Sequence, residues 1–339
     1  MRNLVLFLIS GVLLVNAAPK AFAGATLNKV RSAGTLACGI NTEEPEYTLD
    51  DAHGNHTAFD IDVCKAVAVA VLGPDAKFTI KPFRDEASSL NALQSGEIVL
   101  LATASTNIRF ANGSVGFARP ILYDYQGFLV NKAMAISSPK DFAGKKVCFL
   151  IGTEIEAEVD AYMNREMIKY IPGPFSEEGE MEVALLTRNC AAITADVTQL
   201  AYERIAFKAR AKDFDILPAV IAKDPLAPAY RPDDPQWGAI VDWTMQALIQ
   251  AEEAGITQSN VQEMKKRNDV TLRRLLGAQR GYGQFLGLDD DWAARVIEAV
   301  GNYGELFERD LGSRSQMKLD RGANNLWTHG GLMYANPIR

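Results

Sequence analysis

The sequence repeatedly alternates short strand-like runs with helical runs, and this alternation strongly limits the folds open to it. TLACGI is followed by a helical stretch over 61–71, then by KFTIKPF, the helical SSLNALQSG and the strand-like EIVLLATA. From Lys145 the pattern restarts with KKVCFLIG, a helix predicted over 154–169, the helical MEVALLTRN and the strand-like CAAITAD. Such alternation is typical of βαβ units with a mostly parallel sheet. It predicts an α/β protein with two lobes.

Two segments could connect these lobes. YQGFLVNKAMAI, residues 125–136, is β-rich and suits a strand that crosses between the lobes. LPAVIAKDPLAPAY, residues 217–230, could be the returning strand, broken by Pro225 and Pro228. Paired crossing strands form a hinge beside a cleft, and small ligands commonly bind in such clefts.

The first 23 residues are predicted to be a secretory signal peptide. Arg2 precedes an apolar stretch over 4–15, and Ala-Phe-Ala at 21–23 suits a cleavage site. A membrane anchor is the alternative, but the apolar stretch is shorter than the roughly 20 residues of a bilayer span. Cleavage removes two cations, Arg2 and Lys20, and no acid, so the net charge changes from −7 to −9. This acidic balance argues against a nucleic-acid partner.

The chain from Pro235 onward is predicted to be helical. WGAIVDWTMQALIQAEEAG and DDDWAARVIEAVGNYGELFERDLG carry apolar residues at a spacing of three and four, which indicates buried helix faces. The expected division is therefore a signal peptide over 1–23, lobe 1 over 24–130 and 226–265, lobe 2 over 131–225, and a C-terminal helical extension over 266–339 packed on the lobes.

Export favours disulfides for the four cysteines, which allow three pairings. Cys38 and Cys64 lie in a strand-like and a helical run close in sequence, and Cys148 and Cys190 lie in two later strand-like runs. We predict the pairs Cys38–Cys64 and Cys148–Cys190. No metal site or cofactor is expected, because no C-x-x-C occurs and the three histidines are scattered.

Two places could bind an anion. Arg109 follows the small and hydroxylic residues of ATASTNIRF, and a guanidinium can hold a carboxylate or phosphate through two hydrogen bonds. Gly152 and Thr153 stand between a strand-like run and a helix that starts near Glu154, where backbone N–H groups favour an anion. An ordinary turn with a Thr N-cap is the alternative.

Asp196 ends an apolar strand-like run, CAAITAD, just before a helical run. A carboxylate at the carboxyl end of a parallel strand faces the crevice where open α/β sheets bind ligands. A simple helix N-cap is again the alternative. Arg109 for an anion and Asp196 for a cation would together suit a zwitterion, of which an α-amino acid is the commonest.

These residues belong to a wider set of segments in which the chain resembles a known family, the periplasmic substrate-binding proteins of polar and general L-amino acid ABC importers. The matching pieces include LNKVRSAGTLACGI, AFDIDVCKAVAVAV, YDYQGFLV, GKKVCF-x-x-GT and LWTHGGLMYANPIR. The resemblance implies a type II periplasmic-binding fold that closes on an L-amino acid. It also implies that Arg109 and Thr106 hold the α-carboxylate with a backbone N–H of Gly152, Thr153 or Glu154, and that Asp196 holds the α-ammonium.

The binding segment departs from the family pattern. Relatives usually have Gly-x-Thr-x-Thr-x-x-Arg, whereas this chain has Ala102, Ala104, Thr106 and Arg109, so one expected hydroxyl is missing at Ala104. Several relatives hold the ligand side chain between two aromatic rings. The approximately corresponding positions are Glu43 and Glu86, which would favour a cationic or strongly polar ligand, with solvated surface acids as the alternative. Tyr47 is then the best candidate for stacking.

These features predict a monomeric periplasmic receptor that captures an L-amino acid by lobe closure and delivers it to an ABC permease of the inner membrane. No Ser/His/Asp arrangement, H-E-x-x-H or P-loop is visible, so we expect no enzyme. Two alternatives stay open: a periplasmic dehydratase-like enzyme of the same fold, and a sensory scaffold that has lost its ligand.

Overall fold

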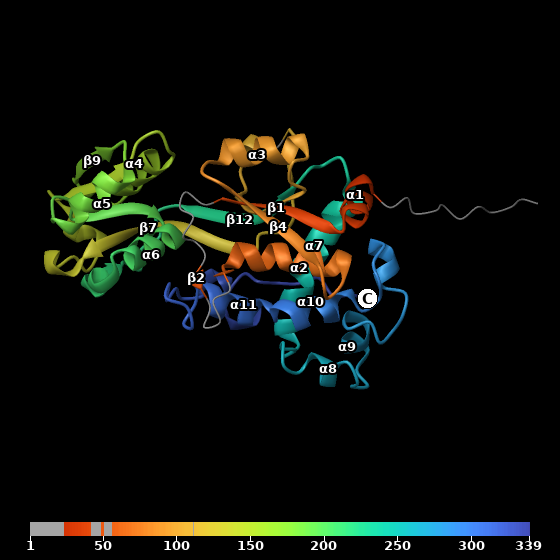
Figure 1. The fold of residues 1–339 in the computed structure, drawn as a ribbon. Helices are drawn as coiled ribbons and strands as arrows, with labels where there is room; N and C mark the ends of the chain where they lie inside the picture. Colours follow the sequence, from red (N-terminus) through yellow and green to blue (C-terminus); the bar gives the residue numbers. More distant parts are fainter. Residues whose placement is uncertain (1–23, 42–48, 51–55, 111) are drawn as a thin grey trace, which may run out of the picture.

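The computed structural model describes residues 24–41, 49–50, 56–110 and 112–339. The predicted signal peptide, Glu43 and Tyr47 lie outside the described residues. Most of the described chain forms two α/β lobes side by side, joined by two long strands (Figure 1).

Ten strands hydrogen-bond into one sheet with the order β4-β1-β5-β12-β7-β10-β8-β9, and β6 and β11 pair with β12 and β7. The strands of this sheet are β1 (Thr35–Asn41), β4 (Lys77–Phe83), β5 (Leu100–Ser105), β6 (Gly116–Phe117), β7 (Leu122–Asn131), β8 (Lys146–Leu150), β9 (Ile171–Phe175), β10 (Ala192–Asp196), β11 (Phe214–Ile216) and β12 (Lys223–Tyr230). A separate pair is formed by β2 (Leu49–Asp50) and β3 (His56–Thr57).

The two halves of the sheet have the same topology. The first half has the order β4-β1-β5 and the second half has the order β9-β8-β10, so the first strand of each half lies between the other two. The third strand of each half, β5 or β10, pairs with a strand that arrives from the other half, β12 or β7. The first three strands of each half are parallel, and the arriving strand, β12 or β7, is antiparallel to them. β7 and β12 also pair with each other, with Leu226 opposite Leu122, and form the hinge.

The returning strand differs from its prediction. Residues 217–222 are not part of it, and β12 contains both prolines although it lies between β5 and β7. Proline cannot donate to a strand ladder. Pro228 lies where the pairing with β5 shifts register, between Ala227 and Ala229, while the Pro225 carbonyl accepts the N–H of Thr106 at 3.1 Å. The register shift therefore accommodates Pro228, and at Pro225 the carbonyl still takes part in hydrogen bonding.

Strand β9 was not expected from the sequence. Its residues, IPGPF, contain two prolines, and it occupies the outer edge of the sheet, where strand prolines are tolerated. Gly173 permits this pairing, because a Cβ there would lie 2.5 Å from the Cys148 Sγ.

Helices cover both faces of each half. In the first lobe α2 and α3 lie on opposite sides of the sheet (Figure 1). In the second, α4 packs into one core cluster and α5 and α6 into another. The helices of this part are α1 (Ala25–Ala33), α2 (Phe59–Leu72), α3 (Glu86–Ser95), α4 (Ile155–Arg165), α5 (Glu178–Leu186) and α6 (Val197–Ala206), with short 3-10 turns η1 (Ile108–Phe110), η2 (Lys132–Met134), η3 (Pro139–Phe142) and η4 (Lys208–Asp213).

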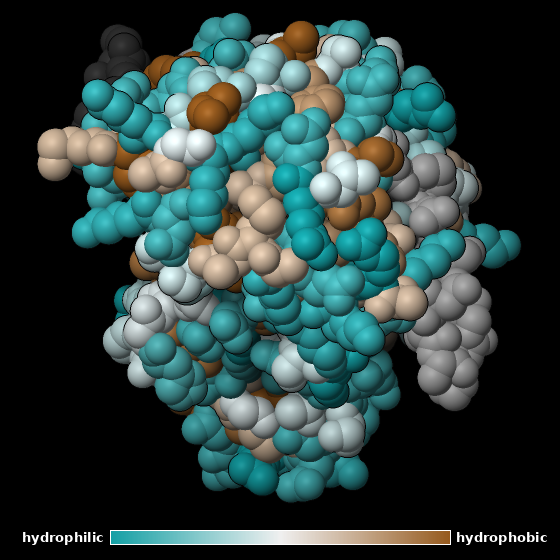
Figure 2. Space-filling model, turned by 90° about the vertical axis from the view of Figure 1, so that its left-hand side faces the viewer, coloured by the Kyte–Doolittle hydropathy of each residue, from teal (hydrophilic) through white to brown (hydrophobic). Residues whose placement is uncertain are grey.

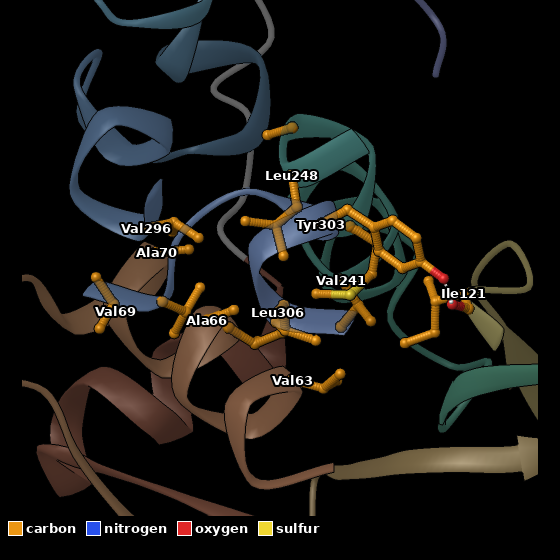
Figure 3. Close-up of a cluster of buried hydrophobic side chains, with 14 of the residues drawn as sticks. Val63, Ala66, Val69, Ala70, Ile121, Val241, Leu248, Val296, Tyr303 and Leu306 are labelled. Atoms are coloured by element: carbon orange, nitrogen blue, oxygen red, sulfur yellow. Dashed lines mark hydrogen bonds between the residues drawn. The ribbon is translucent and has the colours of Figure 1, made fainter. Parts of the chain in front are cut away.

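The C-terminal part of the chain is helical and shares the core of the first lobe. Its helices are α7 (Pro235–Glu253), α8 (Val261–Met264), α9 (Val270–Leu275), α10 (Trp292–Val300) and α11 (Tyr303–Asp310), with 3-10 turns η5 (Gly283–Leu286), η6 (Gly322–Asn324) and η7 (Trp327–His329). Val296 and Leu306 pack with Ala66 of α2 and Val241 of α7 (Figure 3). The Tyr303 hydroxyl donates to the Ile121 carbonyl at 2.9 Å, close to the start of the hinge strand β7.

Two disulfides join the pairs that the sequence predicts. Cys38 in β1 bonds to Cys64 in α2, and Cys148 in β8 bonds to Cys190, each with a Cα–Cα distance of 5.9 Å. The first disulfide therefore fixes β1 to α2, and the second fixes β8 to the residues just before β10.

No helix among the described residues combines the length and apolar character of a bilayer span. The end of the molecule formed by the second lobe is mainly hydrophilic, with apolar residues scattered over it (Figure 2).

Candidate functional site

A cavity of about 350 Å³ lies beside the hinge and is lined by residues of both lobes. Asn41 ends β1, Ser105 ends β5 and Asp196 ends β10, and all three line the cavity. The hinge strands contribute Asp124 and Asp224. The cavity thus lies at the carboxyl ends of parallel strands, where α/β sheets commonly bind ligands.

Among the charged residues of the cavity wall, eight acids stand against two cations. We call Asp60, Asp124, Asp196 and Asp224 the acidic cluster; all four line the cavity, and the cations of its lining are Arg84 and Arg109. A wall of this composition favours a ligand that carries positive charge.

Three members of the acidic cluster accept hydrogen bonds from hydroxyl groups. Thr103 donates to Asp60 at 2.9 Å, and Ser105 donates to Asp224 at 2.5 Å. Thr198 donates to Asp124 through its hydroxyl and its backbone N–H. Burial raises the pKa of Asp60 and of Asp124 to about 6 despite these bonds, and it also raises the pKa of Asp224.

Asp124 and Asp224 lie directly opposite each other on β7 and β12. Like charges opposite each other on paired strands repel. The hinge therefore carries a repulsive pair that a bound cation would relieve.

Asp196 stands at the N-cap position of α6, but its carboxylate accepts no hydrogen bond from the helix or from any other described residue. Burial, followed by the charges of Asp124, Asp224 and Glu158, raises the pKa of this carboxyl to about 8. The N-cap alternative thus does not explain Asp196. Its ionised form lacks a partner, and a ligand ammonium group could provide one.

Arg109 lies in η1 on the first lobe and lines the same cavity, with 56% of its side chain exposed. Its guanidinium lies 3.4 Å from the Glu86 carboxylate and 3.8 Å from that of Glu154, which belongs to the second lobe. Its Nε donates to the Asn107 Oδ1 at 3.2 Å. The guanidinium thus lies near carboxylates of both lobes, at distances longer than those of a paired guanidinium and carboxylate.

The predicted turn lies beside Arg109 but does not line the cavity. Gly152 has a φ of 80°, a left-handed conformation that favours glycine. The Thr153 hydroxyl donates to the Leu150 carbonyl at 3.0 Å, and the N-cap residue of α4 is Glu154, so Thr153 is not the N-cap.

Thr106 and Ala104 are placed differently from each other. The Thr106 hydroxyl donates to the Pro225 carbonyl at 2.8 Å, so it supports the hinge, and it does not line the cavity. Ala104 is buried and lines the cavity. Asn41 adds a buried Oδ1 that has no hydrogen-bond partner among the described residues.

Sequence reasoning missed three members of the acidic cluster, Asp60, Asp124 and Asp224. Asp124 and Asp224 stand in the two predicted crossing strands, so paired acids in those strands were a signal that could have found them. It also missed Asp310, Leu311 and Met317 of the C-terminal part, which line the cavity. Among the described residues no group of three or more His, Cys, Asp or Glu side chains is arranged to hold a metal ion.

Two α/β lobes on paired hinge strands, with a polar cavity between them, define a type II periplasmic-binding fold. The chain belongs to the bacterial extracellular solute-binding proteins, family 3, whose sequence profile matches residues 36–259.

Similar proteins match the chain over nearly its whole length. It is 40% identical to the general L-amino acid-binding periplasmic protein AapJ of Rhizobium johnstonii, over 100% of both chains. It is 39% identical to the glutamate/glutamine/aspartate/asparagine-binding protein BztA of Rhodobacter capsulatus, over 94% of this chain and 95% of that protein. A solved periplasmic binding protein from Brucella ovis with glutathione bound is 38% identical, covers 93% of this chain and 99% of its own, and superposes with a TM-score of 0.82.

Proposed function

We propose that the protein captures an L-amino acid between its lobes and delivers it to an ABC permease. The observation that carries this proposal is the pair of opposite charges, Arg109 from the first lobe and Asp196 from the second, lining one cavity. Closure would bury both charges of a zwitterion, and each would be paired when it is desolvated.

In this arrangement the ligand carboxylate binds Arg109 and replaces the Glu86 and Glu154 contacts. The ammonium group binds Asp196, and the unpartnered Asn41 Oδ1 can accept one of its hydrogen atoms. The names of AapJ and BztA support an amino acid as the ligand. The glutathione-bound relative supports testing glutathione as well, because its γ-glutamyl end carries a free α-amino acid group.

One relative is named as a periplasmic protein and another as an ABC transporter-binding protein, and these names support export and delivery to a permease. The chain is exported, its residues 1–23 are removed, and it works as a monomer. Lobe 1 comprises 24–130 and 226–265, lobe 2 comprises 131–225, and the extension follows. The protein binds its ligand without converting it.

Calorimetric titration with the common L-amino acids, their D-isomers, polyamines and glutathione tests the function. We expect saturable binding of at least one L-amino acid with no product formed. Asp196→Asn should weaken that binding by at least about thirtyfold, because truncating one partner of a buried charge pair costs about 2–5 kcal/mol. Arg109→Ala should weaken it more than Arg109→Lys does, although lysine cannot reproduce the planar fork.

Arg119→Ala is the matched control, because Arg119 is a surface arginine near one carboxylate, that of Asp242 at 3.8 Å, and lies outside the cavity. Its affinity should equal that of the parent. A response to polyamines alone would contradict the amino-acid assignment, and unchanged affinity in Arg109→Ala would contradict the carboxylate site.

A further inference from the structure

Part of the cavity wall comes from outside the shared family region. Asp310, Leu311 and Met317 line the cavity, whereas the family profile ends at residue 259. The segment after α11 reaches back to the hinge strands (Figure 1), where the Asn324 side chain accepts the Tyr123 N–H at 2.7 Å and donates to the Tyr123 carbonyl at 3.1 Å. The C-terminal extension is thus part of the site.

The end of α11 is fixed to the helix that borders the cavity. The Arg309 guanidinium donates to Asp62 of α2 and, at 3.1 Å, to Asp310. Both carboxylates are buried. Phe59 and Asp60, in the first turn of the same α2, line the cavity. The position of Asp310 and Leu311 relative to the cavity is therefore set by a buried ionic contact.

The loop formed by residues 311–319 is held from both lobes. The Leu319 N–H donates to the Leu311 carbonyl at 2.9 Å and closes the loop. From the second lobe, Arg204 of α6 donates to the Met317 carbonyl at 2.5 Å. The Met317 side chain is only 4% exposed. The 311–319 loop is thus a packed element that contacts lobe 2 as well as lobe 1.

Along the hinge the cavity changes from charged to apolar. Leu122 pairs with Leu226 two residues from the Asp124 and Asp224 pair, so all four side chains lie on one face of the hinge strands. Leu122 and Leu226 pack in the same core cluster as Met317. Other cavity-lining members of that cluster are Phe59, Tyr202 and Leu311.

We propose that the 311–319 loop is a specificity wall of the binding site. Met317 and Leu311, together with Leu122 and Leu226, contact the ligand side chain beyond its charged head and set the length of the apolar stem that fits. The ligand class is an L-amino acid with an unbranched side chain that has such a stem. This inference rests on the proposed function.

The test uses the full exported protein and three series of L-amino acids that grow by single methylenes. These are 2-aminobutyrate, norvaline and norleucine; aspartate, glutamate and 2-aminoadipate; and 2,4-diaminobutyrate, ornithine and lysine. Titration gives the affinity ratio of the longest to the shortest member. One buried methylene changes affinity about fourfold, so two change it about fifteenfold.

Met317→Ala lengthens the cavity, and the ratio should shift toward the longest member by about tenfold. Met317→Trp shortens the cavity and should shift the ratio in the opposite direction. Met333→Ala is the matched control, because Met333 is 1% exposed, belongs to the same core cluster and lies outside the cavity lining. Its ratio should equal that of the parent.

Thermal unfolding of each variant checks that it is folded. An effect that only loosened the structure would weaken all members of a series equally, and that result would overturn the proposal. An unchanged ratio in both Met317 variants would overturn it too. A parent that binds no L-amino acid would overturn the proposed function itself, and this inference with it.

Discussion

At the scale of single residues, the protonation of Asp196 links binding to pH. Burial and the nearby acids Asp124, Asp224 and Glu158 raise the pKa of Asp196 to about 8, so the empty site holds this carboxyl largely neutral at pH 7. An ammonium ligand favours the ionised carboxylate. Binding must therefore release a proton at pH values between the lower pKa of Asp196 in the complex and about 8.

This coupling gives a pH dependence with a defined sign. Affinity should rise by up to about tenfold per pH unit between pH 6 and 8 and level off above, since one proton is released. The stability of the ligand-free protein should show the opposite trend and decrease as the pH rises. The unfolded chain ionises Asp196 near pH 4, whereas the folded chain holds the proton up to about pH 8, so this group's contribution to stability is complete below pH 4 and is lost as the pH rises to 8.

Calorimetry at pH 6, 7 and 8 in buffers of different ionisation enthalpy measures the proton release. In Asp196→Asn the remaining binding should show less release than in the parent. An affinity that does not change between pH 6 and 8 would show that Asp196 is not the ammonium partner.

The site residues differ in how readily they can be predicted from the sequence. Arg109 and Asp196 have local signals, namely a cation after small residues and an acid that ends an apolar strand. Neither Asp124 nor Asp224 indicates a site by itself. They become a pair only through the register of two strands that are 100 residues apart in the sequence. Met317 has no local signal, because a loop position near a cavity depends on the packing of α11 and on the bond from Arg204.

At the scale of elements, periodicity predicts the parts of the fold that are locally determined. The stripe of α7 and the apolar run of β10 lie where the pattern places them. β9, and the continuity of β12 through its two prolines, were not predictable, because proline usually opposes strand formation. Edge position and a shift in register, which are properties of the assembled sheet, accommodate these prolines.

The contribution of a disulfide to the free energy of unfolding can be measured directly. Cys148 and Cys190 are 42 residues apart, and replacing both with serine should lower the free energy of unfolding of the second lobe by about 3–4 kcal/mol. Denaturant unfolding with and without reductant measures the change. The free energy of unfolding of the reduced parent should be closer to that of the variant than the value of the oxidised parent is.

The mass of protein recovered from the periplasm is a companion measurement. It should correspond to residues 24–339 with four oxidised cysteines. A mass that includes residues 1–23 would contradict cleavage of the signal peptide, and two free thiols would contradict one of the disulfides.

At the scale of the whole molecule, ligand binding should close the lobes. Arg109 and Glu154 already approach to 3.8 Å across the cleft, and a zwitterion held by both lobes adds contacts that exist only when they are together. We expect the radius of gyration from small-angle X-ray scattering to decrease on addition of the tightest-binding amino acid.

The Asp196→Asn protein serves as the control for closure. At a ligand concentration that saturates the parent, its radius should stay at the ligand-free value. Equal compaction of both proteins would mean that the ammonium contact does not drive closure.

The interior of the molecule is divided in a way that bears on how it moves. Most of the second lobe packs around two clusters of its own, whereas the C-terminal helices extend the core of the first lobe. Ala201 and Tyr202 of α6 nevertheless pack into the core of the first lobe, so a rotation about β7 and β12 has to slide this contact. We therefore expect the resistance to opening to lie where α6 meets the first-lobe core, while the two clusters of the second lobe keep their packing.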